Sequence, residues 1–300
     1  MSAHHRKRPW RRPVLSAVVI AAVAASTAAY ASGAEPPSAG AGAHDDAHYG
    51  KTHYSETRDG DTRHGGTYGD TAYDDTYYDG AIGKTGAELK NALHGIIGEQ
   101  TALSYDEVWD ALKTTDEDPE NPDNVVLLYS GRSQAKSSNG GGANDWNREH
   151  VWAKSHGDFG TATGPGTDIH HLRPEDVTVN STRGNLDFDN GGDPVDEAPG
   201  SRSDGDSFEP RDAVKGDVAR MILYMAVRYG GGDGFPDLEP NDQVDNGSAP
   251  AMGRLSVLKQ WNDQDPPDAF EKSRNDKIFT IQKNRNPFID HPEWVAEIWK

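Results

Sequence analysis

The chain has 300 residues, a formal net charge of −19 and no cysteine. The absence of cysteine excludes a disulfide-stapled scaffold and argues against a structural zinc centre, so a hydrophobic core or a bound metal must hold the fold. The acidic total excludes a protein whose whole surface attracts nucleic acid.

The first 31 residues have the pattern of a secretory signal. Five basic side chains precede an apolar run over residues 14–31, which ends in the A-x-A motif Ala29-Tyr30-Ala31. A transmembrane anchor is the alternative, but the run is barely long enough to span a bilayer. We therefore expect a secreted, extracellular protein that leaves the membrane after cleavage, with the twin-arginine route also permitted. Loss of the five basic residues changes the net charge from −19 to −24.

Residues 32–83 differ in composition from the rest of the chain. They are rich in Gly, Asp, Thr, His and Tyr and contain almost no aliphatic residues, so they cannot bury enough apolar surface to offset the entropy of ordering. We expect a disordered linker, with metal binding by its histidines as the alternative. Residues 84–300 are long enough for one globular domain, which we expect to be a monomer.

Periodic apolar residues and turn signals predict that this domain is α+β and mainly α. Leu89 and Leu93 recur at helical spacing, and Ser104-x-x-Glu107 is a capping box. In chain order we expect a helix at 86–97, a helix at 105–113, an acidic turn at 115–124, strands at 125–130 and 146–152, a Gly-rich loop at 155–167, a strand at 168–172, a helix at 174–184 with Pro174 in its first turn, a long surface loop at 186–210, and helices at 212–229, 253–261, 269–285 and from Pro292 onward.

The strand at 146–152, WNREHVW, contains an adjacent acid and imidazole, Glu149 and His150. Successive side chains of a strand point to opposite faces, so one group can bind one partner while its neighbour faces a different one. This arrangement suits a metal ligand beside a general base. A charged edge strand is the alternative interpretation of these seven residues.

The helix at 174–184 supplies a possible partner for this pair. Asn180 lies thirty residues after His150, on a helix that can pack back against the first strand. Glu149 and Asn180 offer hard oxygen ligands, which favour Mg²⁺, with Ca²⁺ or Mn²⁺ as alternatives. His150 would then be free to take a proton from water.

Charge is distributed unevenly along the acidic chain. The segment 126–185 holds six basic and six acidic side chains, and is therefore neutral inside a strongly acidic protein. We expect an anion to be accepted there, with Arg148, Lys154 and Arg173 as substrate contacts. Its basic residues are Arg132, Lys136, Arg148, Lys154, Arg173 and Arg183.

The segment NREHVWAKSHG…TDIHHLRPEDVTVNSTRGN resembles the ββα-metal (His-Me) finger of the endonuclease I family of extracellular and periplasmic nucleases. VKGDVARMILYMAVRY and QKNRNPFIDHP are similar to the family's C-terminal half, so the resemblance covers roughly residues 86–300. It implies a secreted endonuclease that cleaves DNA, and often RNA, with little sequence preference and leaves 5′-phosphate ends.

Carried over residue by residue, the resemblance makes His150 the general base and Glu149 and Asn180 the ligands of a single divalent metal. Arg183, one helical turn after Asn180, could act catalytically by holding a phosphate oxygen; a salt bridge to a nearby carboxylate is its alternative. His170 matches a recurrent family histidine, and we expect structural hydrogen bonds for it and its neighbour. The chain departs from the family by lacking disulfides and a basic surface.

Two other functions compete with a nuclease. The first is a secreted calcium-binding matrix module that uses acidic loops such as DFDNGGDPVDE and GGGDGFPDLEPND, although these lack EF-hand spacing and are expected to be solvated. The second is a phosphodiesterase for smaller phosphodiesters. The latter needs a closed pocket, whereas a nuclease needs an open groove.

Overall fold

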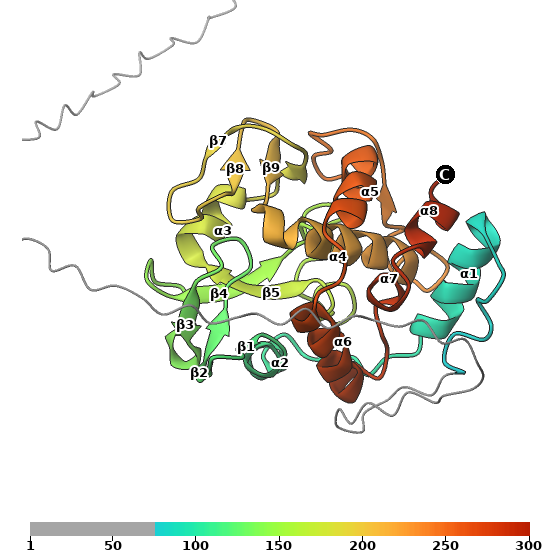
Figure 1. Ribbon diagram of the computed structural model, residues 1–300, viewed down its shortest axis with the longest axis horizontal. Coiled ribbons are helices and arrows are strands. Elements are labelled where there is room, and N and C mark those ends of the chain that lie inside the picture. The colour runs from blue at the N-terminus through green and yellow to red at the C-terminus, as the bar shows by residue number, and fades with distance from the viewer. Residues whose placement is uncertain (1–75) are drawn as a thin grey trace, which may run out of the picture. The chain divides into compact units, whose positions relative to one another are not determined.

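The computed structural model describes residues 76–300, which contain helices and several small sheets (Figure 1). The predicted signal at 1–31 and most of the predicted linker lie outside the described residues. The helices are α1 (Gly86–Ile97), α2 (Glu107–Thr115), α3 (Val177–Arg183), α4 (Lys215–Arg228), α5 (Leu255–Gln264), α6 (Ala269–Gln282), α7 (Pro287–Asp290) and α8 (Trp294–Ile298), with 3-10 turns at Lys136–Ser138 and Asp212–Val214. The strands are β1 (Glu117–Asp118), β2 (Asn121–Val126), β3 (Ser133–Ala135), β4 (Trp146–His150), β5 (Leu172–Asp176), β6 (Asp187–Phe188), β7 (Asp193–Pro194), β8 (Arg202–Ser203), β9 (Ser207–Glu209), β10 (Glu239–Pro240) and β11 (Ala251–Met252).

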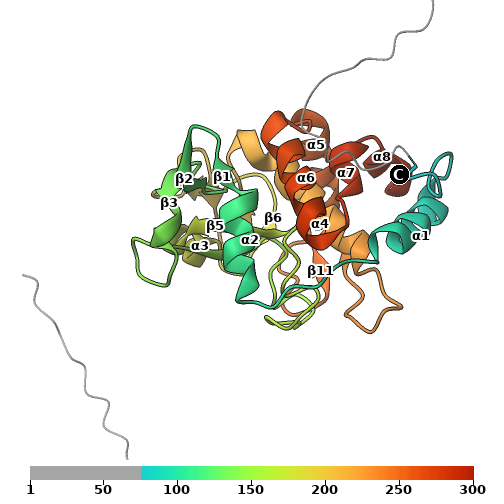
Figure 2. The ribbon, with the colours of Figure 1, turned by 90° about the horizontal axis from the view of Figure 1, so that it is seen from below.

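Helix α4 is the centre of the larger hydrophobic core. Its residues from Gly216 to Arg228 are all buried, because α1, α5 and α7 pack around it (Figures 1 and 2). A helix that is enclosed on all sides needs a broad apolar surface, which the sequence of 212–229 shows. None of the described helices is long and apolar enough to cross a membrane.

A second, smaller core lies between α2, α6 and the paired strands β4 and β5. Trp146 of β4, Leu172 of β5 and Ile278 of α6 are buried there with Val108 and Leu112 of α2. The turn before α2 has the predicted capping box: Ser104 N donates to Glu107 Oε2 at 2.7 Å, and Glu107 N donates to Ser104 Oγ at 3.3 Å. These bonds fix the first turn of α2, while buried side chains pack the helix against α6 and β5.

Strands β4 and β5 form an antiparallel pair that is followed directly by α3. The register places His150 opposite Leu172 and Trp146 opposite Asp176. The second strand was predicted at 168–172 and the helix at 174–184, so both boundaries were wrong. Pro174 lies within β5, and its carbonyl accepts from Leu128 N at 3.1 Å. Because N and O of one strand residue face the same side, the missing N–H of Pro174 costs no bond to β4.

The true N-cap of α3 is Asp176, whose side chain accepts from Thr178 N and Val179 N.

Two other boundaries differ from the prediction because short partner strands leave no clear sequence pattern. The strand predicted at 125–130 is β2, which begins earlier in the acidic turn and pairs with β3. The loop predicted at 186–210 contains β6–β9, a four-stranded sheet in the order β6-β9-β8-β7.

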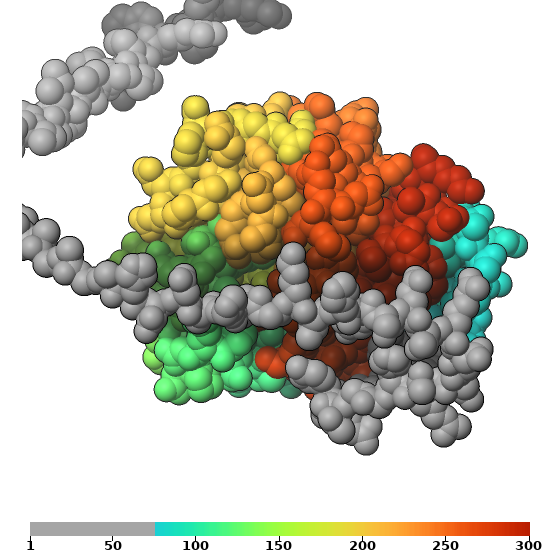
Figure 3. Space-filling model, in the orientation of Figure 1, coloured from blue at the N-terminus to red at the C-terminus, as the bar shows by residue number. Residues whose placement is uncertain are grey.

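The small sheet and α5 adjoin on one face of the molecule, where the segment of β6–β9 is yellow and that of α5 is orange (Figure 3). Trp261 of α5 donates to Asn190 Oδ1, in the connection between β6 and β7, at 2.9 Å. This contact ties the segment between β6 and β7 to helix α5.

The first described residues belong to the folded domain, although the linker was predicted to extend to residue 83. Tyr78 is 3% exposed and donates to Asp290 Oδ2 at 2.8 Å, and its ring packs edge-on against Trp294. Ala81 is also buried in the larger core. The folded domain therefore includes residues 76–83.

Candidate active site

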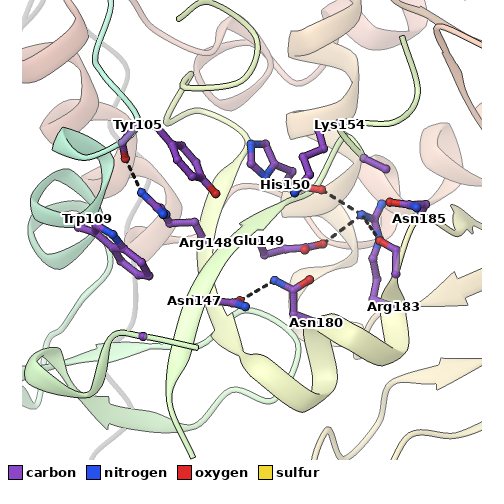
Figure 4. Close-up of a pocket in the computed structure, with 13 residues that line it drawn as sticks. Tyr105, Trp109, Asn147, Arg148, Glu149, His150, Lys154, Asn180, Arg183 and Asn185 are labelled. Atoms are coloured by element: carbon purple, nitrogen blue, oxygen red, sulfur yellow. Dashed lines mark hydrogen bonds and ion pairs between the residues drawn. The ribbon is translucent and has the colours of Figure 1, made fainter. Parts of the chain in front are cut away.

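One pocket of about 300 Å³ lies across β4 and the start of α2 and reaches α3 (Figure 4). It brings together six of the seven residues that the sequence proposed for catalysis, metal binding or substrate contact. These six are Arg148, Glu149, His150, Lys154, Asn180 and Arg183. Its rim includes the exposed residues Lys154, Gly184 and Asn185, so the pocket opens to solvent.

Glu149 is buried, and its carboxylate is held by two neighbours. Tyr129 OH donates to Oε1 at 2.8 Å, and Arg183 Nη1 lies 3.2 Å from the same atom. Burial raises the pKa of Glu149, and the charge of Arg183 and the hydrogen bond from Tyr129 oppose this rise. No side chain among the described residues donates to Oε2, which leaves this oxygen available as a ligand.

Asn180, on α3, has a fixed orientation. Its Nδ2 donates to Asn147 Oδ1 at 2.6 Å, so its own Oδ1 is turned toward the Glu149 carboxylate (Figure 4). The alternation along β4 explains the pairing, since Asn147 and Glu149 share the face that α3 covers. Two oxygen atoms from different elements, each a possible metal ligand, therefore point into one pocket.

This donor set fits a hard divalent cation. Mg²⁺ is commonly held by one or two protein oxygens, with waters and substrate phosphates completing its shell. Within residues 76–300 no group of three or more His, Cys, Asp or Glu side chains could hold a metal ion. A cation held by Glu149 and Asn180 would thus keep positions open for substrate.

His150 faces the other side of β4 from Glu149. Its Nε2 lies 3.1 Å from Gly166 O, so Nε2 carries the proton and Nδ1 remains the basic nitrogen. Burial first, and then the proximity of His171, lower the pKa of His150 well below its ordinary value. A neutral imidazole in the pocket can act as a general base near pH 7.

Arg183 is not available for the phosphate contact considered from the sequence. Its side chain is 1% exposed, and besides Glu149 it donates to His150 O at 2.9 Å and Val151 O at 2.7 Å. The alternative, a salt bridge to a carboxylate, is therefore the one that the structure contains. Arg183 holds Glu149 and the end of β4 in place.

The three predicted substrate contacts have different environments. Lys154 is exposed at the rim, and Arg148 is half-buried in the pocket; neither forms an ion pair within the described residues. The prediction is wrong for Arg173, which is 2% exposed and lies with its Nε 2.6 Å from Asp116 Oδ1. A cation buried against a carboxylate cannot reach a nucleic acid.

The two histidines before β5 have structural contacts, as expected. His170 Nε2 lies 3.3 Å from Asn284 O, and His171 Nε2 lies 2.7 Å from Pro165 O. Burial lowers the pKa of each to about 4, so both rings are neutral near pH 7.

Four pocket or supporting residues were missed by the sequence analysis. Tyr105 and Trp109 line the pocket from the start of α2, Asn147 orients Asn180, and Tyr129 holds Glu149. A signal existed only for the first two, whose aromatic rings recur at i, i+4 on one face of a predicted helix.

Comparison with known proteins identifies the family of this chain. Residues 85–293 match the family model described as Endonuclease I. The chain belongs to the endonuclease I family. It is therefore a nuclease, as the sequence predicted.

Two curated relatives cover most of this nuclease. It is 70% identical over 220 residues to an extracellular ribonuclease of Bacillus amyloliquefaciens, covering 73% of this chain and 76% of the relative. It is 67% identical over 221 residues to an extracellular ribonuclease of Bacillus subtilis (strain 168), covering 73% and 77%. An extracellular deoxyribonuclease of Aeromonas hydrophila is 33% identical over 81 residues, which cover 27% of this chain and 28% of the relative. The extracellular location in these names agrees with the predicted export.

Proposed function

We propose that this nuclease is a secreted endonuclease that hydrolyses RNA, and also DNA, to products with 5′-phosphate ends. The sequence analysis placed DNA first, whereas the names of the two relatives that cover most of the chain favour RNA. The observation that supports the proposal best is the meeting of Glu149, His150 and Asn180 in one solvent-open pocket.

The chemistry follows from the residues of the pocket. His150 Nδ1 accepts a proton from a water molecule, whose oxygen forms the new bond to phosphorus. The bond from phosphorus to the 3′ oxygen breaks, and this oxygen takes a proton from solvent water and leaves as the 3′ hydroxyl. The phosphate stays bonded to the 5′ oxygen of the neighbouring nucleotide. Glu149 and Asn180 would hold the divalent cation, which as a Lewis acid stabilises negative charge on the phosphate and the leaving oxygen. Mg²⁺ is the ion that we propose for this site.

The electrostatics of the pocket favour an anionic substrate. Arg148, Lys154 and Arg183 contribute three positive charges to its lining, against one negative charge from Glu149. The chain as a whole is strongly acidic, so the pocket is a local exception that accepts phosphate. Its exposed rim suits a polymer, which must enter and leave along the surface.

An activity assay tests the proposal directly. Purified protein should degrade single-stranded RNA and supercoiled plasmid with Mg²⁺, and neither substrate with EDTA. We expect His150→Ala to lower kcat by a factor on the order of 10²–10⁴, because the general base is lost. His94→Ala is a matched control, since His94 is half-buried and its Nδ1 lies 2.8 Å from Val227 O, outside the pocket. Equal rates for His150→Ala and the parent would overturn the assignment.

A further inference from the structure

Arg148 is a cation without a carboxylate partner among the residues that the structure describes. It lies two positions before His150 on β4, so both side chains project to the same face of the strand. Both also line the pocket (Figure 4). Among the described carboxylates, only Asp106 acts on this charge electrostatically, without an ion pair, so the guanidinium is suited to a phosphate of the nucleic-acid backbone.

Two aromatic rings from α2 and the turn before it enclose this cation. The guanidinium carbon of Arg148 lies 3.4 Å from the ring centroid of Tyr105 and 4.0 Å from that of Trp109. Arg148 Nη1 also donates to the carbonyl oxygen of Tyr105. A long side chain that is stacked and bonded in this way keeps little of its rotamer freedom, so less entropy is lost when it binds an anion.

Tyr105 also connects the cation to the general base. Its ring stacks on the His150 imidazole with a centroid separation of 5.9 Å and an interplanar angle of 26°. The capping box between Ser104 and Glu107 holds the turn on which Tyr105 lies. The order of groups across the pocket is therefore Trp109, Arg148, Tyr105 and His150.

We propose that Tyr105 and Trp109 are positioning residues that hold Arg148 as a preformed phosphate-binding cation beside the general base. This inference rests on the proposed nuclease function. Arg148 contacts the backbone phosphate, and the two aromatic residues act through it. Their contribution is thus lost when Arg148 is absent.

A double-mutant cycle tests this dependence. Binding of a fluorescent single-stranded RNA is measured by anisotropy at low salt in EDTA, so that no cleavage occurs. We expect Arg148→Ala and Tyr105→Leu each to weaken binding by about 10-fold, the effect of losing a stacked, charge-assisted contact. The double variant should bind no more weakly than Arg148→Ala alone. Tyr105→Phe keeps the ring and should bind within about twofold of the parent.

Phe270→Leu is the matched structural control, because Phe270 is a half-buried ring facing another arginine, Arg173, outside the pocket. It should leave RNA binding unchanged. Additive losses in the double variant would overturn the positioning role, because a general effect on folding persists without Arg148. If the parent cleaves RNA while the losses are additive, only this inference fails. A parent that neither binds nor cleaves RNA overturns the proposed function as well.

Discussion

The hydroxyl of Tyr129 should control metal affinity although it is outside the set of proposed ligands. It donates to Glu149 Oε1 at 2.8 Å, and both side chains are buried. A hydrogen bond to a buried charge contributes about 1.5–3 kcal/mol. In Tyr129→Phe this oxygen keeps only Arg183 at 3.2 Å, so the pKa of Glu149, already raised by burial, should rise further. Because a carboxylate must be in its charged form to hold a metal ion, this change should weaken metal binding.

We therefore expect Tyr129→Phe to weaken Mg²⁺ binding by about 10- to 100-fold, the usual effect of removing a group that orients a metal ligand. Titration calorimetry near pH 7 measures the affinity, and activity should recover when the Mg²⁺ concentration is raised by the same factor. Tyr229→Phe is a matched control: Tyr229 is also buried, and its hydroxyl donates to the buried carboxylate of Asp168 at 3.0 Å, outside the pocket. Both variants should lose similar stability, but only Tyr129→Phe should lose affinity for the metal. Unchanged Mg²⁺ binding in Tyr129→Phe would refute Glu149 as a ligand that depends on this contact.

Three further predictions concern stability and salt. Burial lowers the pKa of His171 to about 4, so its contribution to stability is complete above the unfolded pKa near 6.5 and is lost as the pH falls toward 4, at about 1.4 kcal/mol per pH unit. In urea unfolding, the free-energy advantage of the parent over His171→Gln should shrink by about 2 kcal/mol between pH 7 and pH 5. Parallel pH profiles would contradict this. A chain beginning at residue 84 lacks Tyr78, which is 3% exposed, so its free energy of unfolding should be about 3–5 kcal/mol lower than that of a chain beginning at residue 76. Equal melting temperatures would show that this segment contributes nothing to stability. The cleavage rate in a NaCl series at fixed Mg²⁺ should pass through an optimum, because salt screens the repulsion between the acidic surface and the nucleic acid. Arg148 and Lys154 would supply two phosphate contacts, and each contributes a slope of about −0.7 to −0.9 to log affinity against log salt concentration. A steep fall in rate from the lowest salt upward would indicate a larger basic groove.

Local patterns were sufficient where the relevant forces act within a few residues. The helix at 86–97 was predicted with its observed bounds, because apolar spacing and helix geometry share one period. The capping box at Ser104 was confirmed because its partners lie three residues apart. Alternation along β4 likewise predicted that Glu149 and His150 face opposite sides, whereas Asn180 was proposed from its place on a helix thirty residues after His150 and from the family resemblance.

Tertiary structure decided which basic side chains form ion pairs and which lie in the pocket without one. Arg148 and Arg173 look equivalent as basic residues near the motif, yet one lies in the pocket and the other is buried against Asp116, 57 positions earlier in the numbering of the chain. Arg183 was open to either role until its contacts with Glu149 and two backbone carbonyls were seen. Which carboxylate pairs with a given basic side chain depends on packing between elements that are distant in sequence, so no local periodicity of the sequence predicts it. The sequence by itself therefore identified the candidate reacting groups, while the fold determined which neighbours hold them and which of the predicted basic residues line the pocket without an ion pair.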